Sequence, residues 1–319
     1  MSHPSRVAPA LMLAALVAAG STALAQSPPL RLIAASNVTV RQTPSVQAPV
    51  VTRLPLGTEV AEAGDADLDK TWVHVVTPDG KDGWVLARLT RPLDPFWKWQ
   101  TQEQVITERL ARSGDGFAAR VELLDFIERV ADSFSDPETR ARMDLYRLQA
   151  LQQALSAVPY RHAKREPYAS WFARYQTWTA PHEPAAAWLL ANDAIWKVHD
   201  SREGTTAADE IAWLAVTAGV GGECEGRLPC YVEWRNRLQG EYLRRHPTGA
   251  HVPEAVSGIA QTAALFGATP ARYTFEPEQD CALLTASLDA LTSAIRSASA
   301  APDREAALAG LAGVRGRCR

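Results

Sequence analysis

The hydrophobic pattern of this chain changes once, near a segment with two prolines, and no other feature constrains its fold as strongly. Before Pro92, short β-branched runs alternate with turn residues, as at Trp72–Val76. From Thr101 onward, apolar residues recur at helical spacing and are interrupted by proline and glycine. We therefore predict an all-β domain followed by an all-α helical bundle. Their predicted bounds are 26–92 and 101–319, with a linker at 93–100.

The β region has the features of a small barrel. About five or six short strands fit between Ser36 and Pro92, which is typical of a closed or nearly closed barrel. Asp79-Gly80 is a tight hairpin signal. Strand alternation places Val73 and Val75 on one face, with Trp72, His74 and Val76 on the other.

Three segments of this region resemble the motifs of bacterial SH3-like (SH3b) domains. Asn37–Ser45 resembles the opening N-V-R-x-x-P-S motif, although Thr39-Val40 is inserted between Val38 and Arg41. Val50–Val60 is similar to V-x-x-L-x-x-G-x-x-V, and Trp72–Val85 is similar to W-x-x-V…G…G-W-V. The resemblance spans residues 36–92. It implies a binding module of the kind that accompanies cell-wall proteins and holds peptidoglycan stem peptides or other peptides.

Arg41, Trp72 and Trp84 are the candidate ligand-binding residues of this module. Aromatic faces and a guanidinium suit contacts with peptides and carboxylates. The alternative is that both tryptophans mainly close the barrel.

The start of the chain predicts export. Residues 1–25 read as a cleavable signal peptide, with Ala23-Leu24-Ala25 as the small-x-small cleavage pattern. An uncleaved membrane anchor is the alternative. We expect cleavage after Ala25, a periplasmic or secreted protein, and no membrane span in the mature chain.

The four cysteines form two plausible disulfides, Cys224 with Cys230 and Cys281 with Cys318. A turn at Ala300–Pro302 lies nearly midway between the second pair, so an antiparallel helical hairpin would bring those two together. Disulfides persist in oxidising compartments, which agrees with export. No Cys-x-x-Cys occurs, so a zinc site is not expected.

The rest of the chain predicts helices with aromatic faces. Glu241–Pro247, with Ala250 and Glu254-Ala255, resembles the helix–proline–helix joint of tetratricopeptide-like repeats. The resemblance implies a partly solenoid-like bundle, although no second copy of the motif is found. Phe96-Trp97-Lys98-Trp99 is expected to dock on the region that follows. Two stripes of aromatic and apolar side chains recur at helical spacing. We interpret both as core packing, and a sugar-stacking groove is the alternative. The first stripe is Trp188, Ile195, Trp196 and His199, and the second is Tyr231, Trp234, Leu238 and Tyr242. The expected helices are 101–112, 116–133, 136–157, 167–178, 183–200, 206–219, 229–246, 250–267, 277–298 and 303–316. Asp136-Pro137 supplies a cap and a first-turn proline at the start of the third.

No catalytic motif is found. His182-Glu183 lacks the second histidine of a zinc protease motif, and the Gly-x-Ser-x-Gly elbow is absent. Glu210 and Glu223 could serve as the acid of a lysozyme-like site, but any surface glutamate could. The histidines show no acidic partners at ligand spacing, and we expect no metal and no cofactor. A net charge of −3 argues against nucleic acid as a partner.

The sequence therefore predicts an exported, non-catalytic binding or adaptor protein of the bacterial cell envelope. Its SH3-like module would bind a peptidoglycan peptide or an envelope protein. One alternative is a peptidoglycan hydrolase with a helical catalytic domain that the module targets to the wall. Another is an envelope-stress or assembly adaptor in which neither domain touches the wall.

Overall fold

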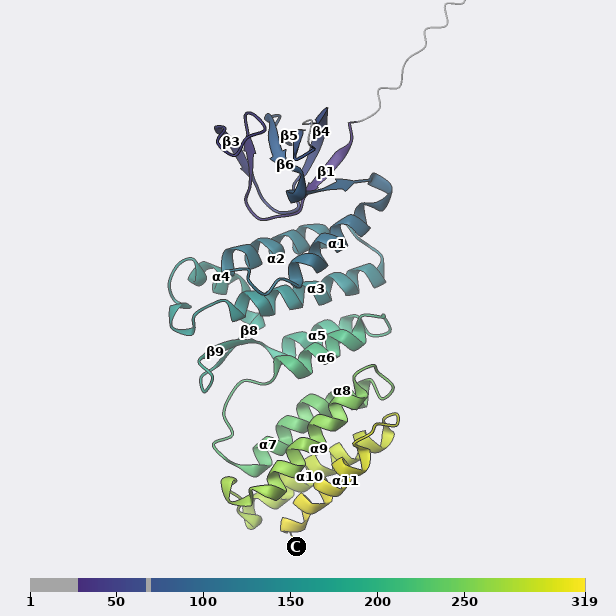
Figure 1. The fold of residues 1–319 in the computed structure, drawn as a ribbon. Coiled ribbons are helices and arrows are strands. Elements are labelled where there is room, and N and C mark those ends of the chain that lie inside the picture. Colours follow the sequence, from purple (N-terminus) through teal and green to yellow (C-terminus); the bar gives the residue numbers. More distant parts are fainter. Residues whose placement is uncertain (1–27, 67–69, 319) are drawn as a thin grey trace, which may run out of the picture.

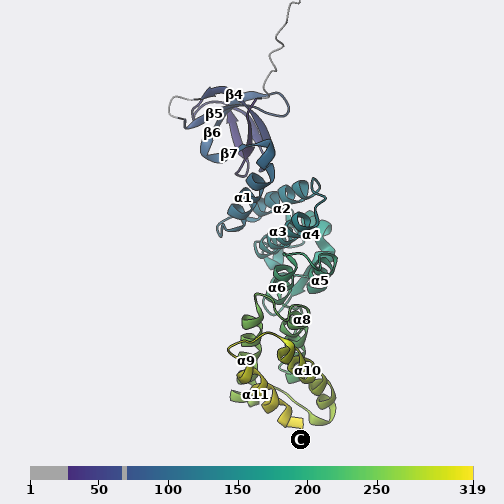
Figure 2. The ribbon, with the colours of Figure 1, turned by 90° about the vertical axis from the view of Figure 1, so that its right-hand side faces the viewer.

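The computed structural model describes residues 28–66 and 70–318, so the predicted signal peptide at 1–25 lies outside the described residues. Figures 1 and 2 show an elongated molecule with the β domain at one end and successive layers of helices leading to the C-terminus. The change from an all-β to an all-α region is confirmed. Within the described residues, no helix combines the length and hydropathy that a membrane span requires.

The β domain is a seven-stranded antiparallel sheet with the order β3-β2-β6-β5-β4-β1-β7. It encloses its own apolar cluster, in which Val73 and Val75 point inward as the alternation predicted. Pro92 is tolerated in β7 because that strand lies at an edge of the sheet. The strands are β1 (Leu30–Ile33), β2 (Val38–Arg41), β3 (Val50–Leu54), β4 (Glu59–Ala66), β5 (Trp72–Val76), β6 (Asp82–Leu86) and β7 (Thr90–Leu93).

Eleven α-helices within the described residues form the second region. Asp136 caps α3 by accepting a hydrogen bond from the Thr139 N–H at 2.8 Å, and Pro137 is its first residue, as the sequence predicted. The helices are α1 (Lys98–Leu110), α2 (Phe117–Ala131), α3 (Pro137–Ser156), α4 (Tyr168–Tyr175), α5 (Asn192–Ser201), α6 (Ala208–Ala218), α7 (Leu228–Arg235), α8 (Glu241–Arg245), α9 (Val252–Ala268), α10 (Pro277–Ser297) and α11 (Arg304–Arg315).

The helix predicted over 183–200 is wrong in its first half. A hairpin of β8 (Thr179–His182) and β9 (Ala187–Leu190) occupies that stretch, and α5 begins only at Asn192. Pro181 and Pro184 cannot donate backbone hydrogen bonds to a helix, and Ala186 has a φ of 46° at the turn. Trp188 therefore belongs to a strand, and the first aromatic stripe is not one helical face.

The second stripe is also interrupted. A π-helical turn, η5 (Asn236–Gly240), separates α7 from α8 within the predicted helix 229–246. The π turn adds one residue to the helical repeat and so changes which side chains share a face.

The segment after the sheet is short and docks only in part. Helix α1 begins at Lys98, inside the range predicted as linker. Phe96 and Trp97 are 91% and 60% exposed, so the docking prediction is wrong for these two residues. Trp99, the second residue of α1, does pack, against Phe134 at 5.0 Å between ring centroids.

The β domain docks on α2 through the tight turn between β3 and β4. The Glu122 carboxylate accepts a hydrogen bond from the Leu56 N–H at 2.6 Å, and the Arg129 guanidinium donates one to the Leu56 carbonyl at 2.9 Å. Phe126 lies between them on the same helical face and packs on Gly57. We call this set of five residues the turn clamp.

The turn clamp continues into a shared hydrophobic core. Leu32, Leu56 and Leu93 of the β domain belong to the same buried cluster as Ile106 and Phe126 of the helices. Because the apolar surface is continuous, the two regions form one packed body.

Gly57 is required at its position for two reasons. Its φ is +78°, and a Cβ there would overlap the ring of Phe126. We expect Gly57→Ala to lower the free energy of unfolding by about 2–4 kcal/mol, as the sum of backbone strain and overpacking. Denaturant unfolding measures this. Gly80→Ala is the matched control, since Gly80 has a φ of +77° and no atom within 4 Å of a built Cβ. Equal losses in both variants would contradict the clamp.

The two disulfides predicted from the sequence are present, Cys224–Cys230 and Cys281–Cys318. The second joins α10 to the C-terminal segment that follows α11, so it closes the open end of the predicted helical hairpin. The two bridges span 6 and 37 residues.

A bridge that closes a longer loop removes more entropy from the unfolded chain. We expect the double serine variant of Cys281 and Cys318 to lose about 4 kcal/mol of unfolding free energy, and that of Cys224 and Cys230 about 2 kcal/mol. Denaturant unfolding of the two variants gives the comparison. A larger loss at the shorter bridge would show that loop closure does not set their contributions.

Candidate functional site

Three neighbouring strands of the sheet carry a row of polar and aromatic side chains. Arg41 on β2 pairs with Trp84 on β6, and Trp84 pairs with His74 on β5. Directly paired residues of an antiparallel sheet share one face, so the three side chains lie side by side. The neighbouring Val40, Val75 and Val85 point into the core, which places this outer row on the outside of the sheet.

The aromatic part of the outer row is held by stacking and by a hydrogen bond. The rings of His74 and Trp84 stack at 4.7 Å between centroids with 9° between their planes. His74 Nε2 lies 2.7 Å from the Asp82 carboxylate, which fixes the imidazole ring over the indole. The Trp84 ring is therefore pre-oriented at the surface.

The basic end of the outer row adjoins exposed apolar side chains. The Arg41 guanidinium donates one hydrogen bond to the Ala48 carbonyl at 2.7 Å, which ties down the β2–β3 loop. Val50, paired with Arg41, is 49% exposed, and Val46 in the loop is 59% exposed. A guanidinium, an indole and two valines together make a surface suited to an extended peptide with a carboxylate.

The structure separates Trp72 from this surface. Trp72 is only 7% exposed, although it lies on the outer face of β5 next to Leu86. Of the three candidates, Arg41 and Trp84 lie together, whereas Trp72 offers a ligand little of its ring. His74 is the third member of the row and was not among the predicted binding residues. Strand alternation places His74 on the outer face, and this is the signal in the sequence that could have identified it.

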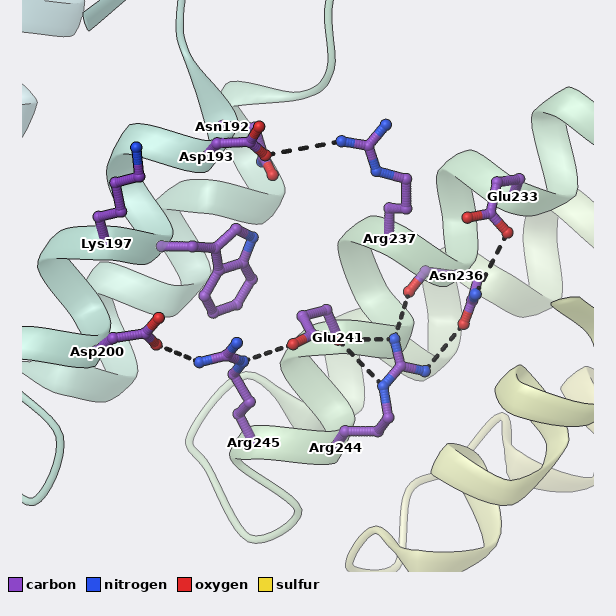
Figure 3. Close-up of a pocket in the computed structure, with 11 residues that line it drawn as sticks. Asn192, Asp193, Lys197, Asp200, Glu233, Asn236, Arg237, Glu241, Arg244 and Arg245 are labelled. Carbon is purple, nitrogen blue, oxygen red and sulfur yellow. Dashed lines mark hydrogen bonds and ion pairs between the residues drawn. The ribbon is translucent and has the colours of Figure 1, made fainter.

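A second concave region, shown in Figure 3, lies between α5 and the segment from α7 to α8 and has a volume of about 440 Å³. Its side chains pair with one another: Arg245 contacts both Asp200 and Glu241, and Arg244 lies 2.8 Å from Glu241. Arg245 also covers the Trp196 ring at 4.9 Å. These contacts pair the charges of Asp200, Glu241, Arg244 and Arg245 with one another and join two helical layers, so we assign this region a structural role.

Two histidines have acidic neighbours in space that are distant in the sequence. His251 lies 3.0 Å from Glu210, and His246 lies 3.5 Å from Asp209. Glu210 thus has a histidine as a surface hydrogen-bond partner, and Glu223 is exposed in the loop before Cys224. In residues 28–66 and 70–318, no three His, Cys, Asp or Glu side chains are arranged to hold a metal ion.

The buried histidine pair links two helical layers. His199 on α5 is 2% exposed, and its Nε2 lies 2.7 Å from Nε2 of His246, which follows α8. Only one ring can donate in such a contact, so protonating both would place two donors face to face. Burial is the largest cause that lowers the pKa of His246, opposed by Asp209 and reinforced by the charges of His199 and Arg245.

Comparison with known proteins identifies the β domain alone. Residues 36–90 match the family model described as the bacterial SH3 domain, which confirms the resemblance seen in the sequence. No curated protein and no solved structure matches the chain. The helical region therefore has no recognised family.

The histidine pair makes stability depend on pH. Since the pKa of His246 is lower in the folded protein than in the unfolded chain, the unfolded state binds more protons just below about pH 6.5. The free energy of unfolding should therefore fall as the pH decreases through that value. In His246→Gln, the free energy of unfolding should depend less on pH in this range. Denaturant unfolding at several pH values measures this. The exposed His162 gives the control His162→Gln, and equal profiles for all three proteins would contradict this assignment.

Proposed function

We propose that this protein is an exported, non-catalytic binding protein of the bacterial cell envelope, whose SH3 domain holds a peptidoglycan peptide or a peptide of an envelope protein. The outer row of Arg41, Trp84 and His74 carries the proposal. It lies within the residues that match the bacterial SH3 family, and its chemistry suits a peptide.

The contacts of such a peptide follow from the row. Its backbone and apolar side chains would lie on the Trp84 ring and Val50, where burial of aromatic and aliphatic surface supplies most of the affinity. A carboxylate of the peptide would pair with the donors of Arg41 that the Ala48 carbonyl does not use. Peptidoglycan stem peptides supply both kinds of group.

Two features support an extracytoplasmic location. The two disulfides suit an oxidising compartment, and the sequence of residues 1–25 has the pattern of a cleavable signal peptide. The family of the SH3 domain agrees with this location.

The turn clamp suggests the role of the helical region. Because Glu122, Phe126 and Arg129 hold the SH3 domain against α2, the helices extend in a fixed direction from the bound peptide. A rigid arm of this kind suits an adaptor that presents a second surface at a set distance from the wall.

Sedimentation with purified sacculi tests the wall-binding part of the proposal. The mature protein should pellet with sacculi, and Trp84→Ala should weaken this binding roughly tenfold or more. Trp97→Ala is the matched control, because Trp97 is 60% exposed and lies outside the outer row. Circular dichroism establishes that each variant is folded. If the wild-type protein stays in the supernatant, wall binding is wrong and a protein partner of the envelope is favoured.

The alternative of a peptidoglycan hydrolase has its own measurement. The purified mature protein is incubated with sacculi while turbidity and soluble muropeptides are followed. We expect neither clearing nor release of fragments. Release of fragments above the level of a heat-inactivated sample would show that the helical region is catalytic.

A further inference from the structure

A cavity of about 310 Å³ lies where the β8–β9 hairpin, the loop after α6, and α7 meet. Leu189, Val220 and Leu238 supply apolar walls. Tyr231 and Trp234 add two aromatic rings whose centroids are 5.8 Å apart. Tyr231, Trp234 and Leu238, three members of the second aromatic stripe, therefore line a cavity. For this stripe, the sequence pattern favoured core packing, with a binding groove as the alternative. This acid pocket, as we name it, is separate from the outer row of the SH3 domain.

Arg235 is the unusual member of the acid pocket. Its side chain is half-buried, and burial alone accounts for the lowered pKa of its guanidinium. Within residues 28–66 and 70–318, its guanidinium has neither an ion pair nor a hydrogen bond to a protein group. A partly desolvated cation without a partner is costly, and proteins usually supply a countercharge.

Other arginines of this chain show the usual solution. The buried Arg109 pairs with Asp115 at 2.7 Å. Arg237, two residues after Arg235, lines a different cavity and lies 3.7 Å from Asp193. The fold thus provides carboxylates for Arg109 and Arg237, but none for Arg235, which lines the acid pocket.

The other polar side chains that line the acid pocket are His182 and Thr262. His182 Nδ1 accepts a hydrogen bond from the Ala185 N–H at 3.2 Å, so the proton of its neutral ring is on Nε2 and can be donated. In the described chain, no carboxylate lines the acid pocket. An anion that enters it would therefore supply the countercharge that Arg235 lacks.

We propose that the acid pocket binds a small carboxylate that carries an apolar group, with the carboxylate paired to Arg235 and the apolar group beside Tyr231 and Trp234. A guanidinium can hold a carboxylate through two parallel hydrogen bonds. The volume accommodates one small acid or the last residue of a peptide. These two sources share the same chemistry, and the site does not depend on what the SH3 domain binds.

Titration calorimetry of the mature protein tests this with N-acetyl-L-leucine and its neutral amide, N-acetyl-L-leucinamide. The acid should bind saturably, and the amide at least tenfold more weakly. Arg235→Gln should lower the affinity for N-acetyl-L-leucine at least tenfold, whereas the matched control Arg237→Gln should change this affinity by no more than about twofold. Equal affinities for acid and amide, or no binding of the acid, would overturn the proposal.

A third probe distinguishes the two sources. N-acetyl-Ala-Ala-Leu presents the same terminal residue on a short peptide. Binding at least tenfold tighter than N-acetyl-L-leucine assigns the pocket to a peptide C-terminus. Binding of N-acetyl-L-leucine without binding of the tripeptide assigns it to a free acid.

The melting temperature separates a binding role of Arg235 from a structural one. Without ligand, Arg235→Gln should melt at the same temperature as the wild type or higher, because an unpaired, partly buried charge is removed. N-acetyl-L-leucine should raise the melting temperature of the wild type and not that of the variant. A ligand-free variant that melts well below the wild type would show that Arg235 supports the fold and would overturn the proposal.

Discussion

The shape of this protein depends on the turn clamp, the contacts between α2 and the turn that joins β3 and β4. Glu122 and Arg129 satisfy the N–H and the carbonyl of Leu56, while Phe126 fills the space that a glycine leaves open. A short connection alone would leave the SH3 domain free to reorient. The turn clamp and the shared core turn two regions of different secondary structure into one elongated body, and they fix the position of anything bound to the sheet relative to the helices (Figure 1).

The sequence predicted those features that depend on local chemistry. The change from period 2 to helical spacing marks the boundary between the regions, a cap and a proline mark the start of α3, and cysteine spacing gave both disulfides. The predictions from the sequence were wrong where contacts between residues that are distant in the chain determine the structure. The stretch before α5 contains enough apolar residues for a helix, but two prolines and pairing with β8 make it a strand. Trp72 could not be told from Trp84, because burial depends on what covers a strand and not on its own residues.

The two sites that we propose differ in how visible they are in a sequence. The outer row follows from strand pairing within a recognised domain, so two of its three members were named from motifs. Arg235 resembles any other helical arginine in the sequence. Only the structure shows that Arg237 has a carboxylate partner, whereas Arg235 lines a cavity in which the described residues place no carboxylate. Missing countercharges of this kind cannot be read from composition, because they depend on which elements meet.

The central claim is that the SH3 domain, held rigidly on α2, receives a peptide across Arg41, Trp84 and His74. Chemical-shift mapping of the mature chain with a purified disaccharide–tetrapeptide fragment of peptidoglycan tests it most directly. The account predicts that the Trp84 indole and the amides of β2, β5 and β6 shift, while those of α2 around Phe126 stay in place. Shifts confined to the helical region, or a rotational correlation time of the β domain well below that of the helices, would contradict it.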